Sequence, residues 1–525
     1  MLDLILKNAR IVDGTGAPWF WGDVAVKDGR IQSVGRLPHG AEAAEIVDAQ
    51  GLFLCPGFID IHSHSDGSIL TCPLNESRVL QGVTTEIAGN CGMSMAPATQ
   101  ERLGDLKAYT GGTGSYQWRS MGDFLHEIEA ARPSTNLGML MGHGTLRLGV
   151  MGYSAQKPTR AQVDAMRVMA RAAMEEGAFG ISSGLIYPPG SYADTDELAE
   201  VVSAIAPYGG YYATHMRDED DKLADSVKEA LETARRAGVP LQISHHKCLY
   251  KPDWRVSCKT TVAMIQQARR QGQDVTCDQY PYRATATTLS CNIPGWAFEG
   301  GFDKVKERLA HPATRERIRQ EVNACHDGRW DTLYVSFVQT EQNQWMCGKS
   351  IPEIANAQGK SCADAMFDII VEENDRVGEV HFAMCEEDIE FIMSQPFVMT
   401  GSDGQAMALN APGKPHPRNY GAFPRILAHY CRKRKLFSME EAVRKLTSMP
   451  AARAGIGNRG LIRPGMRADL VLFDFDKIND DPDYQTPQRA CSGIERVYVN
   501  GVLSAKDGAH TGARAGMALR KEKET

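Results

Sequence analysis

The sequence predicts an α/β protein built around a (β/α)8 barrel, with a small β-sandwich made from both chain ends and an inserted subdomain before the last barrel strand. Strand-like and helix-like segments alternate between about residues 55 and 450, which is typical of parallel βα units. The segments at both chain ends are instead short strands joined by glycine turns. Together the two patterns predict one central barrel with a smaller sheet beside it.

Eight apolar runs bounded by turn residues are predicted to be the barrel strands. They cover residues 53–62, 83–87, 137–141, 180–183, 210–215, 241–245, 274–279 and 397–401. Two of the intervening helices have recognisable starts, because Thr159 with Gln162 and Ser438 with Glu441 have the spacing of capping boxes. The second of these helices is expected to stop at Pro450.

The remaining segments are assigned by their position between and beyond these strands. The gap between the seventh and eighth strands is too long for one connection, so it is predicted to hold a subdomain that shapes the substrate pocket. Strands at 468–473 and 494–501 are expected to complete the small N-terminal sheet. The predicted parts are an N-terminal sandwich segment (1–54), a first barrel segment (55–283), the inserted subdomain (284–365), a last barrel segment (366–455) and a C-terminal sandwich segment (456–525).

The composition argues against several classes of protein. The net charge of -7 over 525 residues is mild, so neither nucleic acid nor an acidic membrane surface is expected as a partner. The N-terminus is predicted to be a strand, not a signal peptide, and no apolar run approaches the roughly 20 residues of a membrane span. The 13 cysteines lack paired spacing, which favours reduced thiols in the cytoplasm. The sequence does not determine the oligomeric state.

Residues of metal-binding types follow five of the predicted barrel strands. His62 and His64 are two positions apart on the first strand, so both imidazoles are expected on the same side. The others, each at or just past the end of a strand, are Cys91, His215, His245 and Asp403. The carboxyl ends of barrel strands meet at one face, so we expect all six side chains at one mouth. Each residue alone has an ordinary structural explanation, such as a turn or a helix cap, but the set of six predicts a metal site.

Zinc is the expected ion. Imidazole nitrogens and one thiolate suit a borderline-soft cation, whereas magnesium or calcium would need oxygen ligands. His245 and His246 are neighbours that point to opposite faces of a strand, so only one of them can reach the barrel interior. The residues alone leave that choice open.

Several short motifs carry a resemblance to a known family. They are the His62-x-His64 pair, Gly89-Asn90-Cys91-Gly92, Gly142-His143-Gly144-Thr145, Thr214-His215-Met216-Arg217, Ser244-His245-His246-Lys247, Tyr280-Pro281-Tyr282, Gly401-Ser402-Asp403-Gly404 and His416-Pro417-Arg418. Over nearly its whole length the sequence resembles the N-acyl-D-amino-acid deacylases, or D-aminoacylases, of the amidohydrolase superfamily. The barrel is then expected to be of the metal-dependent-hydrolase kind.

The resemblance implies how the metal ligands are shared. One tightly held zinc ion is expected on Cys91, His215 and His245, which selects His245 over its neighbour. A second, weaker metal position is expected on His62, His64 and Asp403, with the cysteine able to bridge. Many other amidohydrolases bridge two metals with a carbamylated lysine on the fourth strand. Residues 180–184 contain no lysine, which counts against a hydantoinase or a dihydroorotase.

The resemblance also implies the reaction, hydrolysis of the amide bond of N-acyl-D-amino acids to a carboxylate and a free D-amino acid. A bound zinc ion would make water a better nucleophile and polarise the amide carbonyl. Asp403 is the expected catalytic base, which takes a proton from the attacking water and passes it to the departing amine.

Further residues are expected to bind the substrate. Arg418 resembles the family's carboxylate-binding arginine and Tyr282 its partner. A guanidinium that holds the α-carboxylate through two parallel hydrogen bonds would fix the orientation that distinguishes the enantiomers. His143 is expected to orient the substrate or to support the oxyanion.

The side-chain preference follows from weaker likenesses. Ile186, Trp296 and Met384 resemble the family's apolar pocket, which predicts a hydrophobic side chain. Relatives specific for acidic D-residues carry an arginine near the position of Gly295, and its absence disfavours an acidic side chain, although Lys247 keeps that option open.

Alternatives to these assignments stay open on the sequence alone. His143 is equally compatible with a structural role in a glycine turn, Arg418 with a surface ion pair, and the three pocket residues with core packing. The chain could also act on a different linear or cyclic amide, or be a catalytically silent amidohydrolase-like scaffold. The complete set of ligand types argues against the scaffold.

Overall fold

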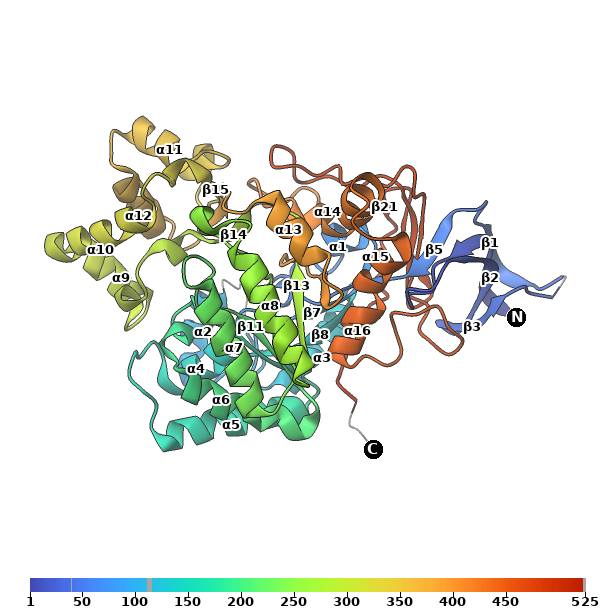
Figure 1. The fold of residues 1–525 in the computed structure, drawn as a ribbon, viewed down its shortest axis with the longest axis horizontal. Helices are drawn as coiled ribbons and strands as arrows, with labels where there is room; N and C mark the ends of the chain where they lie inside the picture. Colours follow the sequence, from blue (N-terminus) through green and yellow to red (C-terminus); the bar gives the residue numbers. More distant parts are fainter. Residues whose placement is uncertain (39, 111–115, 523–525) are drawn as a thin grey trace.

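The computed structural model describes residues 1–38, 40–110 and 116–522, and it has three parts along its longest axis (Figure 1). A sheet that contains the N-terminal strands lies at one end, and helices of a long insertion lie at the other. Between them, parallel strands are surrounded by helices, as the sequence predicts.

The central part contains the eight predicted strand positions. In ring order they are β6 (Phe58–Asp60), β7 (Val83–Ala88), β8 (Asn136–Met139) with its continuation β9 (Met141–Gly142), β10 (Gly180–Gly184), β11 (Tyr211–His215), β12 (Leu241–Ile243), β13 (Val275–Gln279) and β17 (Val398–Thr400). All neighbouring pairs are parallel. The first and last strands meet through the residues that follow them, because Asp403 N donates to His62 O at 2.8 Å and His64 N donates to Gly404 O at 2.7 Å. The predicted (β/α)8 barrel is confirmed.

Helices fill the connections between these strands and follow the last of them. They are α1 (Glu76–Val79), α2 (Leu103–Thr110), α3 (Met121–Ala131), α4 (His143–Met151), α5 (Arg160–Glu175), α6 (Thr195–Val202), α7 (Leu223–Ala237), α8 (Ser257–Arg270), α13 (Glu386–Met393), α14 (Arg418–Arg425), α15 (Met439–Leu446) and α16 (Ser448–Ala454). The predicted capping box of Thr159 and Gln162 opens α5. Ser438 opens α15 as predicted, but that helix already ends at Leu446. Pro450 lies in the first turn of α16, where the missing N–H of a proline costs little.

The two chain ends form one sheet, as predicted. Its strands are β1 (Leu2–Ile11), β2 (Phe20–Lys27), β3 (Arg30–Gly35), β4 (Ala43–Asp48), β5 (Phe53–Pro56), β18 (Leu470–Phe473), β19 (Ile494–Val499), β20 (Val502–Lys506) and β21 (Ala509–His510). Strand β5 joins the two ends, because it pairs with β1 on one side and β18 on the other. Residues 53–62, predicted as one strand, are therefore two. The break falls at Gly57, where a Cβ would lie 2.2 Å from Thr84 Oγ1.

The insertion between β13 and β17 forms a small body of its own. It contains β14 (Thr285–Thr288), α9 (Phe302–Ala310), α10 (Pro312–Cys325), β15 (Leu333–Phe337), α11 (Ile351–Gln358), α12 (Cys362–Glu372) and β16 (Gly378–His381). The three strands pair antiparallel in the order β14-β16-β15, and the helices pack on a separate apolar core. Strand β16 lies beyond residue 365 and pairs with both other strands. The domain bounds drawn from the sequence stay predictions.

Glu379 on β16 gives the insertion a pH dependence that can be tested. Its side chain is buried and accepts a hydrogen bond from Asn292 Nδ2 at 2.6 Å. Burial raises the pKa of Glu379 to about 8, against the opposing effect of that bond. The folded protein then holds a proton that the unfolded chain loses near pH 4.5, so this residue makes the free energy of unfolding fall as the pH rises from about 4.5 to about 8.

We therefore compare the free energies of unfolding of Glu379→Gln and the wild type at pH 5 and at pH 8.5. The value for the variant minus that for the wild type is expected to be larger at pH 8.5, by on the order of a few kcal/mol. Urea unfolding at the two pH values measures the difference, and the exposed Glu316→Gln is the control. A Glu379→Gln protein whose stability relative to wild type does not change with pH would contradict the assignment.

Within the part of the chain that the structure describes, no helix combines the length and apolar character needed to cross a membrane. All 13 cysteines lie in this part, and each is a free thiol.

Candidate metal centre

The six predicted ligands lie where the sequence places them, at the carboxyl ends of the barrel strands. His215 is the last residue of β11, and His245 comes two residues after β12. The other four follow strands β6, β7 and β17. His62 and His64 are not on the strand itself, because β6 ends at Asp60. Their side chains nevertheless reach the same group of residues.

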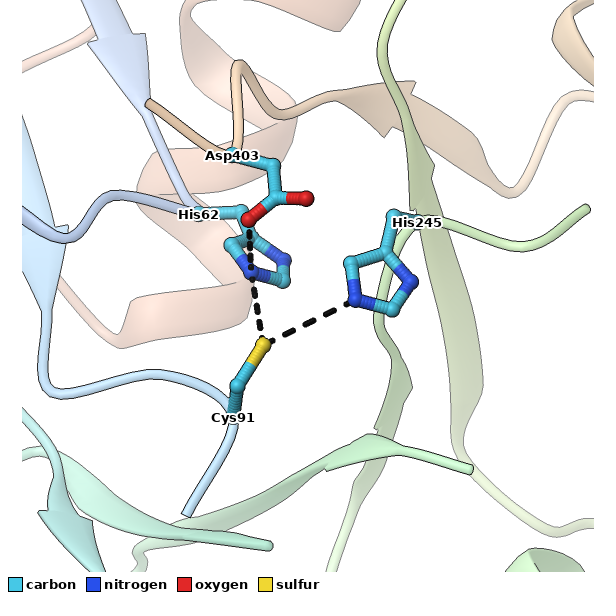
Figure 2. A group of neighbouring side chains, drawn as sticks. All are labelled: His62, Cys91, His245 and Asp403. Atoms are coloured by element: carbon cyan, nitrogen blue, oxygen red, sulfur yellow. Dashed lines mark hydrogen bonds and ion pairs between the residues drawn. The ribbon is translucent and has the colours of Figure 1, made fainter. Parts of the chain in front are cut away.

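Four of these side chains surround one point (Figure 2). The ligand atoms of His62, Cys91, His245 and Asp403 all lie within 4.8 Å of one another. Cys91 Sγ is 3.3 Å from His62 Nε2 and 3.6 Å from His245 Nε2. Asp403 Oδ1 is 3.3 Å from the same nitrogen of His62. The distances bring together residues more than 300 positions apart in the chain.

Each of the other two predicted ligands contacts one member of this group. His215 Nδ1 is 2.9 Å from His245 Nε2, and His64 Nε2 is 3.1 Å from Asp403 Oδ1. The His64 side chain is 26% exposed, whereas the Cys91 and His245 side chains are buried. The group is therefore most open to solvent on the His64 side.

The charges of the group fit a cation. Burial alone would raise the pKa of the Cys91 thiol, but His62, His215 and His245 outweigh burial and hold its pKa well below the usual value. Burial likewise opposes ionisation of Asp403, yet Arg418 and His62 hold the pKa of that carboxyl well below its usual range. A thiolate and an ionised carboxylate among imidazoles form the donor set that a borderline-soft divalent ion prefers. The residues present thus fit a metal ion of the predicted kind.

Three of the predicted ligands have a backbone conformation that non-glycine residues rarely adopt. Cys91 and Asp403 have φ angles of 53°, and His245 has 34°. Non-glycine residues are uncommon at positive φ, and such strain concentrates at functional sites because the surrounding structure must hold it in place. The backbone before Cys91 is closely packed: Gly89, two residues earlier, has no room for a side chain, since a Cβ would lie 2.1 Å from Leu140 O.

Two buried carboxylates that the sequence analysis missed contact the ligands from behind. Asp278 Oδ1 is 3.0 Å from His62 Nδ1 and accepts a hydrogen bond from the backbone N of His245 at 2.7 Å. Glu219 Oε1 is 3.0 Å from His245 Nδ1. Carboxylates in this position orient metal-binding imidazoles in many proteins. Asp278 could have been found from the sequence, because side chains alternate between the two faces of strand β13 and this places an acid on one of them. Glu219 lies in a run of four acidic residues, a pattern typical of a solvated loop.

Arg418, the predicted substrate clamp, is the first residue of α14 and is buried beside the ligands. Its Nη1 donates to Asp403 Oδ2 at 2.7 Å and its Nη2 donates to the Ala286 carbonyl at 2.8 Å. The guanidinium lies 4.9 Å from the ring centre of Tyr280. The predicted partner Tyr282 instead packs its ring 5.2 Å from that of His416. Of the two tyrosines in the motif, Tyr280 is the one that the structure places on Arg418.

Two other predicted substrate residues are engaged in buried ion pairs. His143 begins α4, and its Nε2 lies 3.2 Å from Glu197 Oε1, which also contacts Arg147. Lys247 Nζ lies 2.6 Å from Glu219 Oε2 and 2.8 Å from His245 Nδ1. Lys247 is therefore adjacent to the predicted ligands, whereas His143 contacts Glu197, the partner of Arg147.

The three predicted pocket residues lie in different surroundings. Met384 is buried in the apolar cluster that contains Tyr280 and Tyr282. Trp296 donates from Nε1 to Glu321 Oε2 at 3.0 Å and packs on the core of the insertion. Ile186 is half-buried in the segment after β10. Their role in side-chain recognition stays a prediction.

Known proteins are similar to this chain over nearly its whole length. The model of the amidohydrolase family matches residues 45–505. The D-aminoacylase of Alcaligenes xylosoxydans xylosoxydans is 35% identical over 519 residues, 99% of this chain and 98% of that protein. The N-acyl-D-aspartate deacylase of the same organism is 34% identical over 525 residues, 98% of this chain and 95% of that protein.

A solved structure also matches this chain over nearly its whole length. The N-acyl-D-glutamate deacylase of Bordetella bronchiseptica, in complex with zinc and a phosphonate that mimics the tetrahedral intermediate, has a TM-score of 0.83 at 32% identity, and the match covers 99% of each chain. The resemblance expected from the motifs is confirmed, and this chain belongs to the amidohydrolase family.

Proposed function

We propose that this protein is a zinc-dependent enzyme that hydrolyses the amide bond of N-acyl-D-amino acids to a carboxylate and a free D-amino acid. The observation that carries the proposal is the convergence of Cys91, His245 and Asp403 within 4.8 Å, with Arg418 bonded to that aspartate. The D-aminoacylase and N-acyl-D-aspartate deacylase of Alcaligenes match this chain at nearly equal identity, which supports the same reaction class.

In this proposal each residue has a defined role. One tight zinc ion is held by Cys91, His215 and His245, with a second, weaker position on His62, His64 and Asp403. When bound, zinc supplies Lewis acidity for the amide carbonyl and for the attacking water. Asp403 accepts the proton of that water on the oxygen that faces His62 and later gives it to the leaving amine, because an unprotonated amide nitrogen is too basic to leave.

Arg418 in this proposal binds the substrate's α-carboxylate. Its guanidinium is held in place by the Ala286 carbonyl and the Tyr280 ring, so little side-chain freedom is lost when a carboxylate binds. With the carboxylate held at Arg418 and the amide carbonyl at the metal, the side chains of the two enantiomers point in different directions, and only one of them enters the pocket. The proposal takes this enantiomer to be the D-form, as in the D-aminoacylase relative.

We further propose a hydrophobic substrate side chain. Lys247, the cation that could attract an acidic side chain, is already paired with Glu219 at 2.6 Å in a buried position. An ammonium has only three N–H donors, and Lys247 directs them to Glu219 and the His245 carbonyl, whereas the guanidinium of Arg418 has five N–H donors and keeps some beyond its bonds to Asp403 and Ala286. The 13 free thiols support a reducing, cytoplasmic location.

The test is a screen of the N-acetyl derivatives of D- and L-methionine, leucine, phenylalanine, aspartate and glutamate, with and without a chelator. We expect hydrolysis of the D-forms, fastest for the apolar residues and abolished by the chelator. Hydrolysis of only the L-forms would contradict the role of Arg418. Activity on other amides alone would favour a different amidohydrolase reaction, and no activity in the zinc-loaded protein would favour a silent scaffold.

Replacement of Arg418 by lysine tests the clamp. A lysine keeps the charge but cannot make two parallel hydrogen bonds, so we expect kcat/KM for N-acetyl-D-methionine to fall about 10- to 100-fold, mostly through KM. Steady-state kinetics measure the change. The control is Arg453→Lys, a buried arginine that pairs with Asp274 at the opposite end of β13. An Arg418→Lys enzyme with unchanged KM would remove the clamp from the proposal.

A further inference from the structure

Glu219 is a buried acid to which the sequence analysis gives no role. It lies in the loop between β11 and α7, in the acidic run Asp218-Glu219-Asp220-Asp221. Its neighbours in this run are partly or fully exposed, but Glu219 itself is only 6% exposed. A buried carboxylate is unfavourable unless charged or polar partners compensate for the lost water. The identity of those partners indicates what Glu219 does.

The two carboxylate oxygens of Glu219 face two predicted metal ligands at once. Oε1 is 3.0 Å from His245 Nδ1, and Oε2 is 3.5 Å from His215 Nε2. These are the nitrogens on the far side of each ring. The near-side nitrogens, His245 Nε2 and His215 Nδ1, lie 2.9 Å apart, and the first is 3.6 Å from Cys91 Sγ.

The position of the proton on each imidazole decides which ring nitrogen can bind a metal ion. A neutral ring has one N–H and one lone pair, so a nitrogen that binds a metal leaves the proton on the other nitrogen. That N–H needs an acceptor when it is buried. Within the described residues, His215 Nε2 and Glu219 Oε1 are buried and form no aligned hydrogen bond. An N–H at His215 Nε2 therefore still needs an acceptor, and Glu219 Oε1 can still accept a hydrogen bond.

Lys247 completes the arrangement. Its Nζ lies 2.6 Å from Glu219 Oε2 and also 2.8 Å from His245 Nδ1. An ammonium group is a donor only, so it cannot accept the proton that His245 Nδ1 carries when Nε2 binds an ion. Lys247 can still donate to Glu219 and to the His245 carbonyl at 3.2 Å. It thereby balances the charge of Glu219 and leaves that carboxylate as the acceptor for His245.

We propose that Glu219 is a positioning residue for the metal centre. It accepts the far-side N–H groups of His245 and His215 and so fixes both rings in the tautomer and orientation that direct their lone pairs toward Cys91. The alternative is that Glu219 binds the ion directly together with the two histidines, a group whose atoms also lie within 4.8 Å of one another. That alternative would use the far-side nitrogens and exclude Cys91. The inference rests on the proposed function only in naming zinc as the ion.

The test measures zinc affinity of the full-length protein by competition with a chromophoric chelator. A carboxylate accepts two N–H groups, a glutamine amide accepts one and presents its NH2 to the other, and an alanine accepts none. We therefore expect zinc affinity to fall about 10-fold in Glu219→Gln and about 100-fold in Glu219→Ala, the range typical for residues behind metal ligands. The control is Glu373→Gln, an equally buried carboxylate in the insertion, which should bind zinc like the wild type.

A second pair of variants covers the case in which loss of Glu219 prevents folding by leaving the Lys247 ammonium unpaired. Lys247→Met and Lys247→Met/Glu219→Gln both lack that charge, and we expect the double variant to bind zinc about 10-fold more weakly than the single one. Equal zinc affinity of these two proteins would overturn the proposal.

Cobalt separates positioning from direct ligation. Each variant is loaded with Co²⁺, and the thiolate-to-cobalt absorption band reports whether Cys91 binds the ion. We expect the band to be the same in wild type and Glu219→Gln once both are saturated, because the ligands are unchanged. A band absent from the wild type, or altered by the substitution, would show direct ligation by Glu219 and overturn a positioning role. These readouts do not need deacylase activity, so they can fail or succeed independently of the proposed reaction.

Discussion

Replacement of Cys91 by alanine is expected to abolish both tight zinc binding and amide hydrolysis. Cys91 supplies the only thiolate among the clustered candidate ligands of the described structure, and its sulfur lies within 3.6 Å of nitrogens of His62 and His245, which follow two different strands. Changes behind metal ligands cost about 10- to 100-fold in affinity, so loss of a ligand should cost more than about 100-fold. Metal analysis after dialysis and hydrolysis of N-acetyl-D-methionine measure the two effects.

The matched control is Cys277→Ala. Cys277 is equally buried and lies on barrel strand β13, but it is not part of the ligand cluster. We expect this variant to keep its zinc and its activity. If Cys91→Ala retained stoichiometric zinc after dialysis, the assignment of the tight site would be wrong.

Replacement of Asp403 by asparagine is expected to lower kcat by about 10²- to 10⁴-fold while the tight zinc ion stays bound. The amide cannot accept the proton of the attacking water, whereas Cys91, His215 and His245 are untouched. Zinc content and steady-state kinetics on the same preparation separate loss of the base from loss of the metal.

Asp388→Asn is the control for this substitution, since Asp388 is a buried carboxylate at the start of α13, where its oxygens accept from the backbone N of Arg255. A zinc-loaded Asp403→Asn enzyme with more than a tenth of the wild-type kcat would assign the proton transfer to another group.

The barrel strands and the ligand cluster could be predicted because both leave regular signals in the sequence. A buried parallel strand is a short apolar run that ends in turn residues, and a candidate ligand such as His215 comes directly at that end. The prediction needed no knowledge of the loops, since the barrel itself brings strand ends together. Gly57 within residues 53–62 was the available signal that this run divides between two sheets.

What could not be predicted depends on contacts between loops. Glu219 is buried against Lys247 and His245 from the next βα loop, and a run of four acids gives no sign of these contacts. The choice of Tyr280 over Tyr282 as the ring beside Arg418 depends on the direction in which α14 enters the site. The left-handed backbone of Cys91 is likewise imposed by the assembled structure, because cysteine rarely adopts it.

The meeting of the first and last barrel strands sets an order on biosynthesis. The backbone bond from Asp403 to His62 joins residues 341 positions apart, so during translation the proposed tight-site ligands Cys91, His215 and His245 leave the ribosome long before Asp403. A nascent chain that ends before residue 397 already contains this thiol and these imidazoles but lacks the last barrel strand, β17. Asp403, the proposed base, is also one of the residues that join the last strand to the first, so the proposed site would be complete only on a chain whose barrel has closed.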